Sequence, residues 1–159
     1  MKQSIMEMLK LLAFIFVIPA CFAEEKTDAK LISKIIKNVG ECAADSNIDF
    51  DLCSEMFEAD AKHDDPKYNP CKCMISCVSK KMNVMSEDGK FKEDESLKII
   101  NDLKTPGYKE EALRVYEICK NPEGTNCEAG FNKVKCVMTN SEKARNLTMQ
   151  LVKTMQGKA

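Results

Sequence analysis

The sequence predicts a compact all-α domain that is cross-linked by disulfide bonds. Apolar residues recur at i, i+3 and i+4 along most of the chain, whereas strand patterns are weak. The periodic segments are short, and nine cysteines occur in 159 residues. A chain of this length is expected to form one domain. The prediction is therefore a single bundle of short helices held together by covalent bonds.

The N-terminus predicts secretion. Lys2 and Lys10 precede a short apolar run over residues 11–18, which a proline and small residues follow. This order is typical of a secretory signal peptide, and we expect one over residues 1–23 with cleavage after Ala23. The run is shorter than the roughly 20 apolar residues that cross a bilayer. We therefore expect an extracellular protein without stable membrane insertion.

Helical periodicity divides the mature chain into six helices and a tail. We assign residues 24–140 to the helical domain and residues 141–159 to a C-terminal tail that is helical as well. The connections between the helices are brief and carry turn residues. The expected helices span residues 27–44, 50–59, 70–82, 93–103, 106–120, 127–139 and 144–155.

Two of these helices begin with the same signal. Asn69 before Pro70, and Thr105 before Pro106, each place a capping side chain directly ahead of a proline. Such pairs favour the N-cap and first helical positions, since proline lacks the amide that a helix start leaves unbonded. The polar stretch over residues 62–67 has no apolar periodicity, so we expect a loop there.

Composition excludes several functional classes. A formal charge of −1 and a pI near 6.0 argue against a nucleic-acid partner, which requires a surplus of Lys and Arg. The single histidine, His63, makes a histidine-based metal centre or a catalytic triad very hard to assemble. We predict no enzymatic activity, no metal and no cofactor. For His63 we expect a solvated loop residue, and a pH switch is the alternative.

The cysteines form an even set once the signal peptide, with Cys21, is removed. An even set in an oxidising compartment is typical of a disulfide framework. A zinc site on Cys71, Cys73 and Cys77 is the alternative, but thiolate sites belong mainly to reducing compartments. Cys73 and Cys77 lie one turn apart on the same helix face, so that helix can bond to two neighbours.

Without Cys53 and Cys71, the spacing of the remaining cysteines follows a known pattern. It reads Cys42-x30-Cys73-x3-Cys77-x41-Cys119-x7-Cys127-x8-Cys136. The spacing resembles the six-cysteine signature of insect odorant-binding proteins of the pheromone and general odorant-binding family, over residues 31–138. The resemblance implies a fold of six helices around a closed apolar cavity. It also implies the pairs Cys42–Cys77, Cys73–Cys127 and Cys119–Cys136.

The two additional cysteines are expected to bond to each other. Cys71 precedes Cys73 by two residues on one helix, so its side chain points to a different side. We therefore infer a fourth disulfide between Cys71 and Cys53.

The resemblance implies a secreted carrier that binds odorants or pheromones in its cavity and brings them to chemosensory receptors. The alternative is a venom, salivary or reproductive-fluid effector that uses the same scaffold and acts through protein contacts. The oligomeric state is left open. We expect the cavity to be lined by the inward stripes of adjacent helices, with ordinary core packing as the alternative for each residue. These residues are Met56, Met74, Val78, Met82, Leu97, Ile100, Leu113, Tyr116, Phe131, Val134 and Met138.

Two polar features complete the expected site. The hydroxyl of Tyr116 is expected to contact a ligand, with Tyr68 and Tyr108 as alternatives. Asn146 begins an N-glycosylation sequon in the tail, and a glycan there would compete with burial of Leu147. The tail helix either covers the mouth of the cavity or packs outside the bundle.

Overall fold

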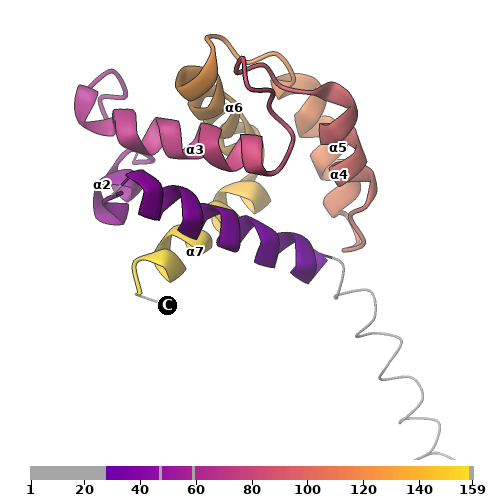
Figure 1. Cartoon of the computed structure of the whole chain (residues 1–159). Helices are drawn as coiled ribbons and strands as arrows, with labels where there is room; N and C mark the ends of the chain where they lie inside the picture. The colour runs from indigo at the N-terminus through magenta and orange to yellow at the C-terminus, as the bar shows by residue number, and fades with distance from the viewer. Residues whose placement is uncertain (1–27, 47, 59, 158–159) are drawn as a thin grey trace, which may run out of the picture.

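Seven α-helices and one 3-10 turn make up the computed structural model, which describes residues 28–46, 48–58 and 60–157 (Figure 1). The first helix covers residues 28–46, and the signal peptide expected over residues 1–23 lies outside the described residues. The all-α prediction is confirmed, with a seventh helix in the tail. The other elements are α2 (Phe50–Glu55), η1 (Pro66–Tyr68), α3 (Asn69–Lys81), α4 (Glu93–Asn101), α5 (Tyr108–Cys119), α6 (Asn126–Asn140) and α7 (Glu142–Met155).

Pairing of extended backbone is confined to one place in the described chain, a bridge between Met85 and Phe91 in the loop before α4. The loop folds back on itself there, because the amide of Lys92 also donates to the carbonyl of Val84 at 2.8 Å. Among the helices described, none is both long and apolar enough to cross a lipid bilayer.

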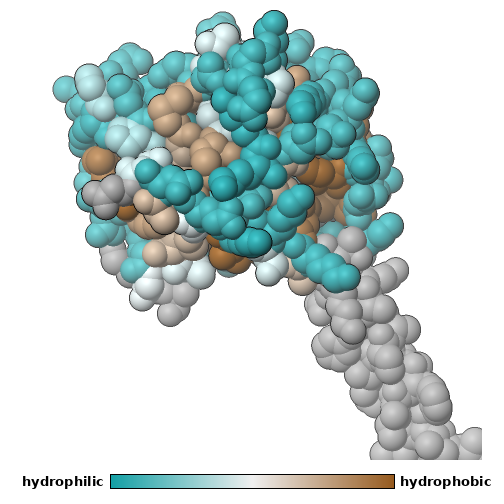
Figure 2. Space-filling model, viewed as in Figure 1, coloured by the Kyte–Doolittle hydropathy of each residue, from teal (hydrophilic) through white to brown (hydrophobic). Residues whose placement is uncertain are grey.

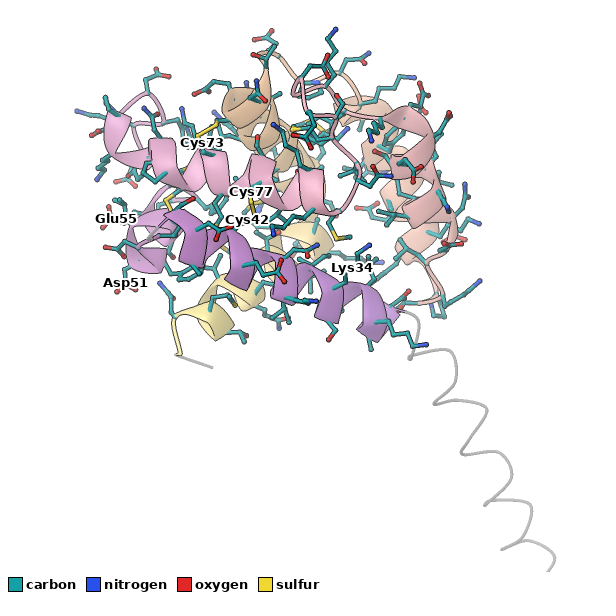
Figure 3. All side chains as sticks on the ribbon, viewed as in Figure 1. Lys34, Cys42, Asp51, Glu55, Cys73 and Cys77 are labelled. Carbon is teal, nitrogen blue, oxygen red and sulfur yellow. A yellow bond between two sulfur atoms is a disulfide. The ribbon has the colours of Figure 1, made fainter. Side chains whose placement is uncertain are left out.

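Four disulfides cross-link the helices, and three of them end on α3 (Figure 3). One turn separates Cys73 from Cys77, and they bond to different neighbours, α6 and the first helix. Cys71 bonds to α2. The four pairs in the structure are Cys42–Cys77, Cys53–Cys71, Cys73–Cys127 and Cys119–Cys136. They are the three pairs that the resemblance implied and the fourth that we inferred.

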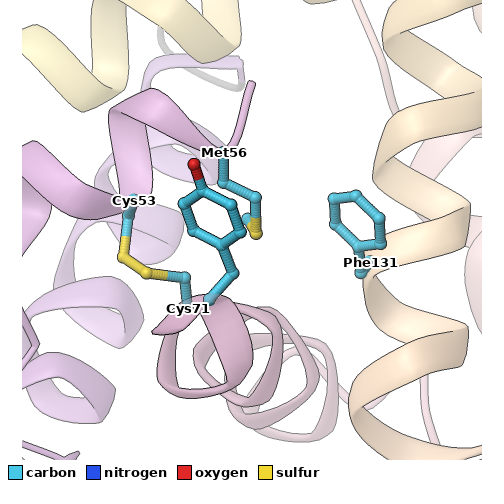
Figure 4. Packing of buried hydrophobic residues seen from close by; sticks show 5 residues of the cluster. Cys53, Met56, Cys71 and Phe131 are labelled. Atoms are coloured by element: carbon cyan, nitrogen blue, oxygen red, sulfur yellow. A yellow bond between two sulfur atoms is a disulfide. The ribbon is translucent and has the colours of Figure 1, made fainter. Parts of the chain in front are cut away.

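The core lies where α2, η1 and α6 meet α3. Its buried members are Cys53, Met56, Tyr68, Cys71 and Phe131, which form one cluster with the Cys53–Cys71 disulfide on one side and Phe131 on the other (Figure 4). Met56, Cys53 and Cys71 are among the most completely buried side chains of the described protein. Burial of these side chains and the disulfide together hold α2, which is only six residues long, against α3.

The start of α3 differs from the prediction. The carboxylate of Asp65 accepts a hydrogen bond from the amide of Lys67 at 3.0 Å and begins the 3-10 turn η1, in the stretch that we expected to be a loop. The turn runs directly into α3, so the residue before Asn69 is already helical and Asn69 is the first residue of α3. The N-cap assignment of Asn69 is therefore wrong.

The start of α5 also differs, and for a different reason. The amide of Thr105 donates to Asp28 Oδ2 at 2.7 Å, and its hydroxyl donates to the same oxygen. Because the hydroxyl is used in this contact, Thr105 does not cap α5. The helix begins after Gly107, whose φ of +74° lies in the left-handed region that favours glycine.

The tail helix α7 connects two distant parts of the bundle. At its start, Ser141 caps the helix by accepting from the amide of Ala144 at 3.1 Å. The guanidinium of Arg145 donates to the carbonyl of Met138 at 3.0 Å, near the end of α6. At its other end, Gln156 Nε2 donates to Asp51 Oδ1 at 2.7 Å on α2. The helix thus spans the bundle from α6 to α2.

Candidate ligand-binding cavity

A cavity of about 400 Å³ lies between α4, α5, α6 and α7, beside the loop that precedes α4. This volume is within the range of about 300–1,000 Å³ that is typical of small-molecule sites. The lining residues are Val84, Phe91, Ser96, Ile99, Ile100, Leu103, Tyr108, Glu111, Ala112, Val115, Tyr116, Lys133, Val137, Ser141, Lys143, Ala144 and Leu147.

The cavity reaches the protein surface. Tyr108 and Leu147, on its wall, are 42% and 37% exposed. Hydrophobic side chains are visible between hydrophilic ones on the side of the molecule where α4 and α5 lie (Figure 2). An apolar ligand therefore has a route from solvent to the interior of this cavity.

The structure separates the residues that we expected to line one cavity. Ile100 and Tyr116 line it. Met56 and Phe131 belong to the buried core, and Met74 packs against them. The remaining expected residues are not part of the cavity wall; Met82 and Met138 are buried, whereas Val78, Leu97, Leu113 and Val134 are partly buried.

Close packing of α6 on α3 explains why most of the expected residues on these two helices do not line the cavity. A Cβ atom added to Gly130 would lie 2.7 Å from Ser76 Oγ and 3.1 Å from the Ser76 amide nitrogen, so the two helices approach more closely than a larger residue would permit. Ser76 also donates a hydrogen bond to the carbonyl of Asn126. The apolar stripes on facing sides of α3 and α6 therefore form a filled interior. The hollow lies on another side of α6, toward α5 and α7.

Hydrophobic stripes alone do not distinguish a filled interface from a hollow one. The glycine on α6 was the available signal, because a small residue on a buried helix face permits close contact. Sequence reasoning also missed Ala112 on α5 and Ala144 on α7, which line the cavity. Where the neighbouring helix does not approach closely, a short side chain of this kind leaves empty space, and the cavity occupies it.

Most polar groups on the cavity wall have partners within the protein. The Glu111 carboxylate accepts hydrogen bonds from Arg114 at 2.9 and 3.0 Å. These bonds lower the pKa of Glu111 below its ordinary value. The Ser96 hydroxyl donates to the carbonyl of Lys92 at 2.8 Å, and Ser141 caps α7. The Lys143 ammonium lies 5.5 Å from the centre of the Tyr108 ring.

Lys133 contributes a buried polar atom without a hydrogen-bond partner to the described cavity wall. Its Nζ atom is buried and has no hydrogen-bond partner among the described residues. The nitrogen lies 5.0 Å from the ring centres of both Phe91 and Tyr116, a distance at which an aromatic face attracts a cation. Burial lowers the pKa of Lys133 to about 8. Sequence reasoning missed it, although Lys133 precedes Val137 by four residues and so shares its helix face.

The three tyrosines occupy different environments. Tyr116 is buried on the cavity wall, and burial together with the negative charge of Glu93 raises its pKa. Tyr108 lies on the exposed part of the wall, and Tyr68 belongs to the core. Tyr116 and Tyr108 are thus placed near a ligand in this cavity, whereas Tyr68 is not.

His63 is not the solvated residue that we expected. It is partly buried, with its ring centre 5.1 Å from that of Phe131 and its Nδ1 atom 3.2 Å from Lys135 Nζ. Burial, followed by the positive charge of Lys135, lowers the pKa of His63. It is not among the residues that line the cavity.

Disulfide formation removes the cysteines that a zinc site would need. Cys71, Cys73 and Cys77 are each bonded to another cysteine. Across the described residues, no group of three or more His, Cys, Asp or Glu side chains is arranged to hold a metal ion.

Comparisons with known proteins agree with this architecture. The sequence model of the PBP/GOBP family matches residues 24–140. General odorant-binding protein 19d of Drosophila melanogaster is 26% identical over 102 residues. The match covers 61% of this chain and 65% of the fly protein, so the chain spans less than two thirds of that relative's length. An odorant-binding protein of Locusta migratoria shares the fold, with a TM-score of 0.61 at 21% identity over 78% of this chain and 91% of the locust chain. The chain therefore belongs to the family of pheromone-binding and general odorant-binding proteins.

Proposed function

We propose that this protein is a secreted, non-catalytic carrier that binds small apolar ligands in the cavity between α4, α5, α6 and α7. The observation that carries the proposal is the cavity itself: about 400 Å³ with a mostly apolar wall that opens at the surface. Membership of the odorant-binding family supports odorants or pheromones as the ligand class and delivery to chemosensory receptors as the purpose.

The size of the hydrophobic contribution suits reversible transport. Burying a chain of about twelve carbons contributes roughly 10 kcal/mol, at about 0.8 kcal/mol per methylene. Association removes at least about 4 kcal/mol of this. The remainder, at most about 6 kcal/mol, corresponds to a dissociation constant of about 40 μM or weaker. A ligand held this weakly is solubilised and still released.

Secretion and glycosylation are parts of the same proposal. The basic and apolar N-terminal residues support a signal peptide over residues 1–23. Asn146 is exposed on α7, so a glycan on its amide would extend into solvent. Expression of the full chain in insect cells tests both parts. We expect mature protein in the medium that begins at Glu24 and loses mass on treatment with a peptide glycosidase; retention in the cells would contradict secretion.

A fluorescent displacement assay tests the carrier function. Correctly oxidised mature protein is titrated with phenylnaphthylamine, a neutral apolar probe, and we expect saturable binding. Ala112→Phe should weaken it at least tenfold, because the new ring occupies the cavity. Ile118→Phe is the matched control on the same helix, since Ile118 is 54% exposed and does not line the cavity.

Two outcomes of this assay would count against the carrier. Absence of saturable binding would favour an effector that acts through its protein surface. Equal loss of affinity in Ala112→Phe and Ile118→Phe would show that the probe does not occupy this cavity.

A further inference from the structure

The cavity contains one buried charge-bearing group without a counter-ion in the described protein. Lys133 Nζ makes no hydrogen bond with the described residues, and the ring centres of Phe91 and Tyr116 each lie 5.0 Å from it. A buried ammonium without a hydrogen-bonding partner is costly. Two aromatic faces offset part of that cost but leave its three donors free.

The remaining ionisable groups on the cavity wall do not supply the missing partner. Glu111 and Tyr108 come from α5 with Tyr116, and Lys143 comes from α7. Glu111 is the carboxylate among them, and its oxygens are occupied by Arg114. The loop before α4 and α4 itself contribute only apolar residues and Ser96 to the wall. The described wall of the cavity therefore offers Lys133 no free acceptor, and a ligand in the cavity can supply one.

We propose that the cavity binds amphiphilic carboxylic acids, with the ligand carboxylate on Lys133 Nζ and the hydrocarbon chain along the apolar wall toward Tyr108 and Leu147. This inference rests on the carrier function proposed above and names its ligand class. A carboxylate neutralises the buried ammonium and accepts its protons in charge-assisted hydrogen bonds. A hydrocarbon or an ester would instead bury the ammonium more deeply without neutralising it.

Competition between two ligands of equal chain length tests the proposal. Dodecanoic acid and dodecanol are each used at neutral pH to displace phenylnaphthylamine from wild-type protein. We expect the acid to bind roughly tenfold or more tightly than the alcohol, because hydrogen bonds between charged groups are the stronger ones. Equal affinities with intact probe binding would overturn the role of Lys133 and leave the carrier function standing.

Two variants locate the effect. In Lys133→Met the preference for the acid should disappear, while dodecanol binds at least as tightly as to wild type. Lys135→Met is the matched control, since Lys135 lies on the same helix but is exposed and does not line the cavity. It should keep the preference. Loss of the preference in both variants, or in neither, would contradict a direct contact with Lys133.

A spectroscopic measurement on wild-type protein makes the test independent of any variant. The ε-methylene signal of Lys133, assigned by NMR, is titrated with pH in the free protein and with each ligand. We expect dodecanoic acid to raise the pKa of Lys133 and dodecanol to leave it unchanged or lower it. An unchanged pKa with bound acid would show that the carboxylate lies elsewhere.

Discussion

Asp28 is a single residue that joins two distant segments. Its carboxylate accepts hydrogen bonds from the amides of Lys104 at 3.1 Å and Thr105 at 2.7 Å, and from the Thr105 hydroxyl. Burial alone would raise the pKa of Asp28, but these hydrogen bonds outweigh it and hold the pKa below the ordinary value of 3.8. The ionised carboxylate thus fixes the first helix to the turn before α5.

Replacement of this carboxylate should destabilise the protein in a pH-dependent way. We expect Asp28→Asn to lower the free energy of unfolding by about 1 kcal/mol at neutral pH. Because the folded-state pKa is depressed, the contribution of Asp28 is present above 3.8 and is lost as the pH falls through the folded value. The difference between wild type and variant should therefore shrink in acid. Urea denaturation over a pH series measures it; a difference that does not change with pH would contradict this role.

Replacement of Lys133 should stabilise the protein, in contrast to replacement of Asp28. Its folded pKa of about 8 is below the ordinary 10.5, so the unfolded chain holds the proton more tightly and the stability of wild type rises between these two values. We expect Lys133→Met to be more stable at neutral pH, by on the order of 1 kcal/mol, and the advantage to vanish toward pH 10.5. Thermal unfolding at a series of pH values checks this, with Lys135→Met as the control. A variant that is less stable than wild type at neutral pH would contradict it.

At the level of elements, α2 depends on its disulfide. Removal of Cys53–Cys71 by a double change to Ala should cost about 3 kcal/mol, since the bond closes a loop with a sequence separation of 18. Hydrogen exchange should accelerate mainly in α2. The matched control removes Cys119–Cys136, which has a separation of 17, and should accelerate exchange in α5 and α6 instead. The same exchange pattern in both variants would show that the bonds do not act locally.

The elements show which parts of the fold were predictable from sequence. The periodic patterns located each α-helix of the described residues, because amphipathic stripes record burial on one face. They did not predict the 3-10 turn η1, and α2 ends at Glu55 rather than near residue 59. The two N-cap assignments were wrong because each residue has a different role in the structure. The 3-10 turn before Asn69 makes Asn69 part of a helix, and the hydroxyl of Thr105 donates to Asp28 instead of capping α5. Both roles depend on how the backbone folds around these residues, which a local sequence pattern does not contain.

The site was less predictable than the helices. Tyr116 and Ile100 line the cavity as expected, but a hydrophobic stripe contains no information on whether the facing helix touches it. That distinction came from Gly130, which brings α6 close to α3. Lys133 was passed over because a lysine is normally exposed, and only its position relative to Phe91 and Tyr116 gives it a role.

For the whole molecule, ligand binding and folding should be linked. A probe that binds only the folded state, present at about 100 times its dissociation constant, should raise the free energy of unfolding by about 2.7 kcal/mol. Chemical denaturation with and without phenylnaphthylamine measures the increase. Reduced and alkylated protein should show none, because the cavity depends on helices that the disulfides hold in place. An equal increase in reduced protein would show that binding does not need the native framework.

The disulfides are distributed unevenly around the cavity. Of its four helical walls, α5 and α6 are covalently joined through Cys119–Cys136, and α6 is joined to α3 through Cys73–Cys127. None of the four bonds ends on α4 or α7. The cavity should therefore adapt to ligands of different length or width by outward displacement of α4 and α7, while the cross-linked part of its wall keeps its shape.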